Sequence, residues 1–327
     1  MNSSLREKVN HKYVPDEVEL KNLFNLLKKS SKHISKLKNP SFIKNDVGMN
    51  HNYTIMDEKK PIYQLKILVR KDYPSLAKIE ATYDLLSENE NVNQLIEIKR
   101  SIFPYGYYLY NYIEGVPGRN FNNEKWIADY CELIIDLKKI ELNYFGNLDE
   151  SFKANSLFEY YQNIDKLVDN SFGGTFNYDF SIWDLTDLGL LEKDYLVDLF
   201  GKITKLAKLL PVRTPHLCHG DMSPHNIIYG DRKYLIDWDE SRSHYWPSEL
   251  ARYLFFTKED KEEVKEIFIK NMDGFIPKEE INLIINLEHT YQYLRRFVIY
   301  SINSDYNKAI LRIEETKKII KKLLESS

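Results

Sequence analysis

Three polar side chains in the C-terminal half of the chain have the types and the spacing that suit chemistry on a phosphate group. Asp221 and Asn226 share one irregular segment, and Asp237 follows after a short, mostly apolar stretch. Carboxylate and amide oxygens are hard ligands of the kind that Mg²⁺ uses beside substrate phosphates. A further carboxylate can orient a hydroxyl and take its proton while a phosphoryl group is transferred. The three residues therefore point to phosphoryl transfer.

A predicted hairpin brings two of these residues together. Residues 226–229 and 233–236 are β-prone, and a Gly-containing turn separates them. The two ends of a tight hairpin lie side by side, so Asn226 at the start of the first strand and Asp237 at the end of the second should meet. Asp221, in the loop just upstream, can reach the same point from another side.

The chain before this hairpin divides at one strong break. Residues 114–118 contain two glycines and one proline, which makes them the best linker candidate in the chain. Before the break, apolar periodicity predicts helices and several strands, with a hairpin turn at 57–61. Expected here are helices over residues 16–38 and 76–86 and strands around Tyr53 and over residues 62–69, 96–98 and 107–113.

After the break the periodicity is helical, and residues 226–238 are the only strand-like segment expected. Helices are expected over residues 124–140, 157–168 and 188–210 and, with breaks, from residue 248 to the C-terminus. The chain is thus predicted to form a sheet-containing N-terminal lobe, residues 1–114, and a larger helical lobe, residues 115–327. A cleft between two such lobes is a favoured place for a small molecule.

The segments that carry the polar residues resemble a known family. Segment 219–226 reads His-Gly-Asp-Met-Ser-Pro-His-Asn and segment 236–238 reads Ile-Asp-Trp. Together they are similar to the catalytic-loop and metal-binding motifs of the aminoglycoside phosphotransferase and choline kinase family, the small-molecule branch of the protein-kinase-like fold. The resemblance implies an α+β, two-lobed fold with a small N-terminal β-sheet lobe and a larger, mainly helical C-terminal lobe.

The resemblance also implies roles for single residues. Asp221 would be the catalytic Asp, Asn226 and Asp237 the ligands of Mg²⁺, and His219 a brace for the loop. The spacing of Asp221 and Asn226 equals that of the catalytic Asp and the metal-binding Asn in protein kinases. ATP or GTP would be the phosphoryl donor.

A second group of residues resembles the family's nucleotide-binding positions. Lys66, in the middle of a predicted strand, is placed like the lysine that contacts the α- and β-phosphates, and Glu80 in the next helix like its ion-pair partner. Segment 48–53 has the position of the phosphate-binding loop, and segment 110–115 that of the hinge whose backbone binds adenine. The residues so assigned are Lys66, Glu80, Gly48, Asn50, Tyr112 and Ile113.

Other residues compete for some of these assignments. Lys71 and Lys78 are alternatives to the phosphate-binding lysine, and Glu88 and Glu90 are alternatives to its acidic partner. Gly48 has the alternative role of an ordinary turn glycine. The packing of the predicted strand and helix decides between them.

The segment after Asp237 departs from the family pattern at one point. The family carries an Asp before Leu-Ala that holds the catalytic loop from below, where this chain has Glu249. Glu249 either holds the loop or faces the substrate. Acidic and aromatic residues nearby suit a cationic acceptor, through charge and cation–π contacts, or else they pack the helical lobe. These residues are Trp238, Asp239, Glu240, Tyr245, Trp246 and Glu249.

Two further features have ordinary explanations. His225 and His244 suggest a metal site, but a zinc site needs three or four ligands in register, and none is visible in the sequence. Both histidines are therefore expected in solvent-facing loops. The Lys-rich segment 310–324 is expected to be an amphipathic helix packed on its own lobe rather than a helix on a membrane surface.

Composition narrows the class of protein. Of 327 residues, 46 are Lys or Arg and 49 are Asp or Glu, a net charge of −3, so the basic excess of a dedicated nucleic-acid binder is missing. With only two cysteines, a disulfide framework is unexpected and a reducing compartment is favoured. No secretory signal and no apolar run of about 18 residues is visible. A cytoplasmic protein with neither a membrane nor a nucleic-acid partner is expected, and the sequence predicts no oligomeric state.

The sequence thus predicts an ATP- and Mg²⁺-dependent phosphotransferase that acts on a hydroxyl of a small molecule. An aminoglycoside or other antibiotic and a choline-like amino alcohol are the acceptors that the resemblance suggests, and a sugar or a nucleoside stays open. The alternative is a kinase-like structural or binding protein, of the spore-coat type, with weak or no catalysis. A protein kinase is disfavoured, because no Ala-Pro-Glu segment follows Asp237.

Overall fold

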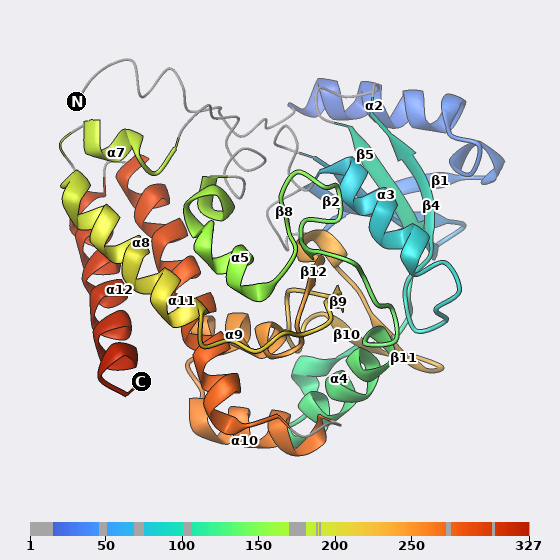
Figure 1. The fold of residues 1–327 in the computed structure, drawn as a ribbon. Coiled ribbons are helices and arrows are strands. Elements are labelled where there is room, and N and C mark those ends of the chain that lie inside the picture. The colour runs from blue at the N-terminus through green and yellow to red at the C-terminus, as the bar shows by residue number, and fades with distance from the viewer. Residues whose placement is uncertain are drawn as a thin grey trace.

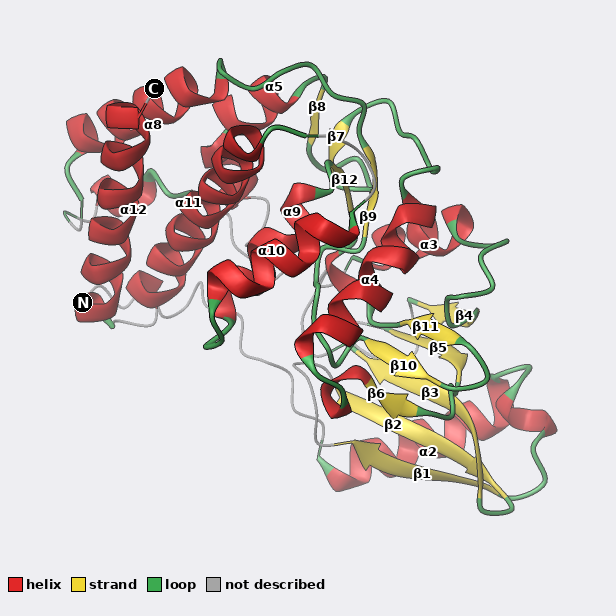
Figure 2. Ribbon diagram, turned by 90° about the horizontal axis from the view of Figure 1, so that it is seen from below, coloured by secondary structure: helices red, strands yellow, loops and turns green. Residues whose placement is uncertain are grey.

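The structure, a computed structural model, separates a β-sheet with two helices from a larger group of helices (Figures 1 and 2). This arrangement confirms the predicted α+β class, with a small N-terminal β-sheet lobe and a larger, mainly helical C-terminal lobe. The described residues are 16–45, 51–68, 75–100, 106–169, 181–187, 189, 191–272, 276–302 and 305–326.

The N-terminal sheet has five strands in the order β1-β2-β3-β5-β4, and all neighbours are antiparallel. The predicted hairpin is its β2–β3 pair, with a two-residue turn at Glu58 and Lys59. Both turn residues have positive φ, 47° and 72°. Two-residue hairpin turns favour positive φ because it matches the twist of the flanking strands. The strands are β1 (Pro40–Asn45), β2 (His51–Asp57), β3 (Lys60–Ile67), β4 (Leu95–Lys99) and β5 (Tyr107–Asn111).

Two helices cover opposite faces of this sheet. Helix α2 (Glu17–Ser30) starts at an Asp16–Glu19 capping box and buries two leucines against Tyr107 and Leu109 of β5. Helix α3 (Leu76–Leu85) packs on the other face, in the core that contains Tyr108. Neighbouring strand residues point to opposite faces, which is why β5 serves both helices.

The predicted linker does not run free between the two parts. Within it, β6 (Val116–Pro117) pairs with β10, so the linker is part of a three-stranded sheet, β11-β10-β6. A Cβ atom on Gly115 would lie 2.4 Å from the Tyr229 carbonyl oxygen, a distance that no side chain tolerates. Glycine is needed here for close approach of two strands. The boundary between residues 114 and 115 stays a prediction.

The C-terminal part is mainly helical, and the Lys-rich tail behaves as expected. Its last helix, α12, lies against α11 and α8 (Figure 1) and buries Ala309, Ile313 and Ile320, which confirms the packed amphipathic helix. Among the residues that the structure describes, no helix is both long and apolar enough to cross a membrane. The main helices are α4 (Asn123–Leu137), α5 (Leu157–Gln162), α7 (Asp184–Asp187), α8 (Lys193–Ala207), α9 (Pro247–Phe256), α10 (Lys261–Asn271), α11 (Lys278–Ile302) and α12 (Tyr306–Ser326).

The expectation of a single strand-like segment in this part was wrong. The predicted hairpin is present as β10 (Ile227–Tyr229) and β11 (Lys233–Leu235), but four other strands form a separate sheet, β8-β7-β12-β9. Strands of two or three residues are too short to show a period of two, so no sequence pattern predicts them. They are β7 (Phe145–Gly146), β8 (Lys153–Ala154), β9 (His216–Cys218) and β12 (Arg242–His244).

Candidate active site

The β10–β11 hairpin joins the predicted metal ligands as expected. Ile227 pairs with Leu235, and the Ile236 N–H donates to the Asn226 carbonyl oxygen at 2.9 Å. The residues before β10 and after β11 are therefore neighbours. Asp237 then takes a left-handed conformation, φ 65°, before a 3₁₀ turn, η3 (Trp238–Glu240). Non-glycine residues seldom adopt this conformation, and active sites are one of the places where it is found.

Asp221 is held from two directions. The Asn226 side chain donates from Nδ2 to the Asp221 carbonyl oxygen at 2.9 Å and to its Oδ2 at 3.1 Å. Arg252 Nε donates to the other carboxylate oxygen, Oδ1, at 2.8 Å. The Asp221 side chain is still 30% exposed, so the fixed carboxylate faces an open space. The structure thus brings Asp221 and Asn226 together, and no sequence pattern pointed to Arg252.

His219 links the loop to the strand that carries Asp237. Its ring is fully buried; Nδ1 accepts the Asp221 N–H at 3.3 Å, and Nε2 lies 2.8 Å from the Ile236 carbonyl oxygen. Because a carbonyl only accepts, the ring carries its proton on Nε2. The imidazole therefore connects the residue before Asp237 to Asp221, which is the geometry of a brace.

Glu249, at the start of α9, holds the same loop from below. Its carboxylate accepts the N–H groups of His219 at 2.5 Å and Gly220 at 2.9 Å, and the hydroxyl of Tyr130 at 3.1 Å. The residue is only 1% exposed, so it does not face a substrate. Of the two roles considered for Glu249, the geometry selects the brace.

Lys66 reaches the hairpin from β3. Its Nζ donates to Asp237 Oδ1 at 2.7 Å and to Asp239 Oδ2 at 2.8 Å, and Tyr108 donates to the other Asp239 oxygen. Burial alone would lower the pKa of Lys66, but the two carboxylates outweigh it and raise that pKa well above its ordinary value. Burial would likewise raise the pKa of Asp237, yet Lys66 holds it below its usual range. The pKa of Asp239 stays above its ordinary value, because burial and the neighbouring Asp237 outweigh the one lysine that the two carboxylates share.

The structure does not bring Glu80 to Lys66. Glu80 pairs instead with Arg100, and both side chains are about half exposed, 46% and 60%. On α3 the inward positions are Ile79, Thr82 and Tyr83, and Glu80 lies about 100° further round the helix than Ile79. Asp239 is the second acidic partner of Lys66, which sequence reasoning had placed near the acceptor. Its only sequence signal is its position two residues after Asp237.

The predicted hinge residues line a cavity. The space has a volume of about 530 Å³ and is bordered by the hinge and by the turn of the β10–β11 hairpin. The Tyr112 N–H is already donated to the Ile62 carbonyl oxygen at 3.1 Å, so this group holds the sheet together. Gly48 and Asn50, predicted for the phosphate-binding loop, lie outside the described residues. The cavity is lined by Tyr112, Ile113, Glu114, Gly115, Gly230, Asp231 and Tyr234.

Most of the aromatic residues after Asp237 pack the core. Trp238 is 1% exposed, Trp246 2% and Tyr245 8%. These rings therefore do not form a cation–π site for an acceptor. The solvent-facing loop expected for His244 was wrong: it lies in β12, fully buried, with Nε2 3.4 Å from the Glu288 carboxylate. His225 is exposed, as predicted.

Comparisons with known proteins agree with this fold. The model of the phosphotransferase enzyme family matches residues 50–271. Among solved structures, the gentamicin complex of APH(2")-IIa has a TM-score of 0.63 at 15% identity, covering 93% of this chain and 96% of that chain. Aminoglycoside phosphotransferase APH(4)-Ia has a TM-score of 0.60 at 13% identity, with 92% and 98% covered.

Spectinomycin phosphotransferase APH(9)-Ia, solved with ADP and spectinomycin, has a TM-score of 0.56 at 14% identity and covers 93% of this chain and 97% of that chain. At such identities the likeness shows the fold alone. No curated protein matches the chain in sequence. Because the family model spans about two thirds of the sequence, including Lys66, Asp221, Asn226 and Asp237, the chain belongs to the phosphotransferase enzyme family.

Proposed function

We propose that this protein transfers the γ-phosphoryl group of ATP or GTP, with Mg²⁺, to a hydroxyl of a small molecule. The observation that carries the proposal is the convergence of Asp221, Asn226 and Asp237 with Lys66 at the β10–β11 hairpin. Three similar solved structures are complexes with ADP or GDP, and they also contain spectinomycin, hygromycin B or kanamycin. For this chain the nucleotide and the acceptor are part of the proposal.

Asp221 is proposed to act on the acceptor. Its carboxylate accepts a hydrogen bond from the acceptor hydroxyl, orients the oxygen toward the γ-phosphorus, and takes the proton as the new O–P bond forms. The bond from the γ-phosphorus to the β,γ-bridging oxygen breaks, and the nucleoside diphosphate leaves. Phosphoryl transfer depends mostly on positioning and charge, which suits a carboxylate fixed by Asn226 and Arg252.

The donor set fits a hard divalent cation. Asn226 uses Nδ2 to hold Asp221, which leaves its amide oxygen for a cation, and the Asp237 side chain is 43% exposed and ionised. Asn226 and Asp237 would hold Mg²⁺, which would offset charge on the β- and γ-phosphates. Lys66 would contact the α- and β-phosphates, and the backbone at Tyr112 and Ile113 would border the adenine.

The test uses the full-length protein and one matched pair of variants. We expect calorimetry to show binding of MgATP, and a coupled assay for ADP to show turnover with at least one member of a panel of aminoglycosides, amino alcohols, sugars and nucleosides. Asp221→Asn should keep nucleotide binding and lower turnover by about 100-fold or more. Asp198→Asn, on the exposed face of α8, should change neither.

Two results would count against the proposal. If the protein binds no Mg-nucleotide, the cleft is not a kinase site. If it binds nucleotide but Asp221→Asn turns over as fast as the parent, the kinase-like structural or binding role that the sequence left open becomes the better description. The cytoplasmic location expected from composition belongs to the same proposal and is checked by fractionation of cells.

A further inference from the structure

Lys66 has two acidic partners, and they differ in how easily they can leave it. Its Nζ donates to Asp237 Oδ1 at 2.7 Å and to Asp239 Oδ2 at 2.8 Å. An ammonium group has three N–H donors, so only one is left for a phosphate while both contacts last. For Lys66 to bind two phosphate groups, one carboxylate has to give up its hydrogen bond.

Asp237 is the partner that can leave. Its side chain is 43% exposed, whereas that of Asp239 is 15% exposed. Asp237 is also a proposed ligand of Mg²⁺. A carboxylate that binds a cation and a lysine that binds a phosphate each keep an opposite charge beside them, so the exchange leaves neither group unpaired.

Asp239 is held in place from both parts of the molecule. It lies in η3, and the turn is anchored just after it, where the Ser241 hydroxyl lies 2.7 Å from the hydroxyl of Thr82 on α3. Both of these residues are fully buried. The Asp239 oxygen that does not contact Lys66 accepts the hydroxyl of Tyr108. With both oxygens bonded and its turn anchored, Asp239 is the fixed partner.

Lys78 of α3, the alternative considered from sequence, does not replace Lys66. It lies close enough to Glu240 and Asp239 for their charges to interact, and Glu240 has the larger effect. Among the described residues, however, no ion pair within 4 Å joins Lys78 to either carboxylate, whereas Lys66 contacts Asp239 directly.

Tyr108 belongs to the same rigid sheet as Lys66. The two residues lie directly opposite each other on β5 and β3, and Lys66 Nζ is 5.5 Å from the centre of the Tyr108 ring. Tyr108 is only 2% exposed. We propose that Tyr108 and Asp239 are positioning residues, which hold Lys66 toward the phosphates of the nucleotide while Asp237 binds Mg²⁺. This is the role that the sequence suggested for Glu80.

This inference rests on the proposed function, and its test measures binding rather than turnover. The full-length protein is titrated by calorimetry with ADP and with adenosine, each in Mg²⁺ and in EDTA. If the parent prefers guanine, GDP and guanosine are used. Lys66 is proposed to meet only the phosphates, so a residue that positions it should affect the diphosphate and not the nucleoside. A change that merely loosens the fold should weaken both.

The main variant removes one hydroxyl and no charge. Tyr108→Phe should weaken diphosphate binding by about threefold or more, in Mg²⁺ and in EDTA, and leave the nucleoside unchanged. In a Lys66→Met background the same substitution should have no further effect, because it acts through Lys66. Asp239→Asn should also weaken diphosphate binding in EDTA, since it acts on the lysine and not on the metal.

The neighbouring tyrosine is a matched control. Tyr107 is also fully buried, and its hydroxyl donates to Glu97 at 2.5 Å, but it belongs to the core on the other face of β5. Tyr107→Phe therefore removes the same group from the same strand. It should leave the binding of both ligands unchanged.

The outcomes are distinct. The inference is overturned if Tyr108→Phe keeps the parent affinity for the diphosphate, weakens the nucleoside equally, or acts in the Lys66→Met background as well. A loss in Asp239→Asn that is seen only with Mg²⁺ also overturns it, because Asp239 then acts on the metal. If the parent binds neither ADP nor GDP, the proposed function fails first and the inference falls with it.

Discussion

The two sides of the proposed active site are built alike but with different cations. On the proposed nucleotide side, Lys66 is shared by Asp237 and Asp239; on the proposed acceptor side, Arg252 is shared by Asp221 and Glu240. In each case one positive charge holds two carboxylates, so each group carries a net charge of −1 when all members are ionised.

The difference lies in the chemistry and the origin of the cation. Lysine is a compact point charge, and Lys66 comes from the sheet, 171 residues before Asp237. Arginine is a rigid fork, and Arg252 comes from a helix only 31 residues after Asp221. The nucleotide side therefore joins the two parts of the molecule, while the acceptor side is assembled within one part. Changes at Lys66 should affect stability and nucleotide binding together, whereas changes at Arg252 should affect Asp221 and therefore turnover.

The largest effect is expected at Lys66. Lys66→Met leaves Asp237 and Asp239 facing each other without a cation, which should lower the free energy of unfolding by about 3 kcal/mol. MgATP affinity should fall by about tenfold or more, because the phosphate partner is lost as well. Urea unfolding and calorimetric titration measure the two effects. The double variant Lys66→Met/Asp239→Asn should recover part of the stability, and unchanged MgATP affinity in the single variant would contradict the assignment.

A comparable effect is expected at Glu249, which supports both sides at once. Glu249→Ala leaves two backbone N–H groups and the Tyr130 hydroxyl without their acceptor, at a cost of about 3 kcal/mol. Glu249→Gln keeps one acceptor oxygen and should cost about half as much. Thermal unfolding measures the loss. A Gln variant as unstable as the Ala variant would show that the charge, and not the hydrogen bonds, holds the loop.

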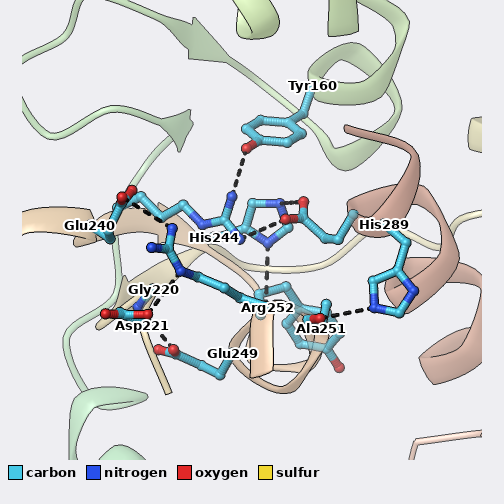
Figure 3. Close-up of polar contacts among 12 residues, drawn as sticks. Tyr160, Gly220, Asp221, Glu240, His244, Glu249, Ala251, Arg252 and His289 are labelled. Atoms are coloured by element: carbon cyan, nitrogen blue, oxygen red, sulfur yellow. Dashed lines mark hydrogen bonds and ion pairs between the residues drawn. The ribbon is translucent and has the colours of Figure 1, made fainter. Parts of the chain in front are cut away.

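Mild acid should weaken the acceptor side through His289. Its Nε2 lies 2.9 Å from the carbonyl oxygen of Ala251, the residue before Arg252, as Figure 3 shows, and burial lowers the pKa of His289 to about 4. In the unfolded chain the His289 ring binds a proton at about pH 6.5, whereas in the folded chain it does so only near pH 4. Stability is therefore complete above pH 6.5 and falls by about 1.4 kcal/mol per pH unit as the pH drops toward 4.

Unfolding measured between pH 7 and pH 4 tests this dependence. His289→Gln keeps a donor for the Ala251 carbonyl but does not titrate, so it should flatten the pH dependence. His216, whose pKa burial also lowers to about 4, contributes with the same sign and should keep part of the slope in that variant. If the stability of His289→Gln depends on pH as steeply as that of the parent, protonation of His289 does not destabilise the protein.

The smallest effect is expected at Glu80, and it separates two candidate partners of Lys66. Glu80→Ala removes a half-exposed ion pair with Arg100, so the stability should change by less than about 1 kcal/mol and MgATP affinity should stay the same. Asp239→Asn, measured in the same assays, should change both the stability and the MgATP affinity. A large loss of nucleotide affinity in Glu80→Ala would mean that Glu80 moves to Lys66 when nucleotide binds.

The parts of the site that could be predicted are those that depend on neighbouring residues in sequence. The β10–β11 hairpin was predictable because its strands and its turn are adjacent, and it alone places Asn226 beside the strand end that carries Asp237. The helix that contains Glu80 was predicted with nearly correct ends. Which face of this helix packs inward was not predicted, because the sequence of a single helix does not specify which neighbour covers its apolar face.

The unpredicted parts arise from contacts across the fold. Arg252 and Asp239 are charged residues with no motif of their own, and only the packing of α9 and of β3 against the hairpin gives them partners. His244 looked like a loop residue because β12 has three residues, too few to show alternation. Residue type and spacing predicted which chemistry was possible, and tertiary structure determined which side chains share it.

Helix α9 has a consequence for how this protein could change its substrate during evolution. Glu249 fixes the backbone of the proposed catalytic loop, and Arg252, one turn further along, contacts the Asp221 side chain. A mutation that tilts α9 to admit a new acceptor also shifts the loop, so substrate range and reactivity would be selected together. New specificities should therefore accumulate first at positions outside α9, such as Glu240 or Lys78, where a substitution alters the pocket without moving the loop.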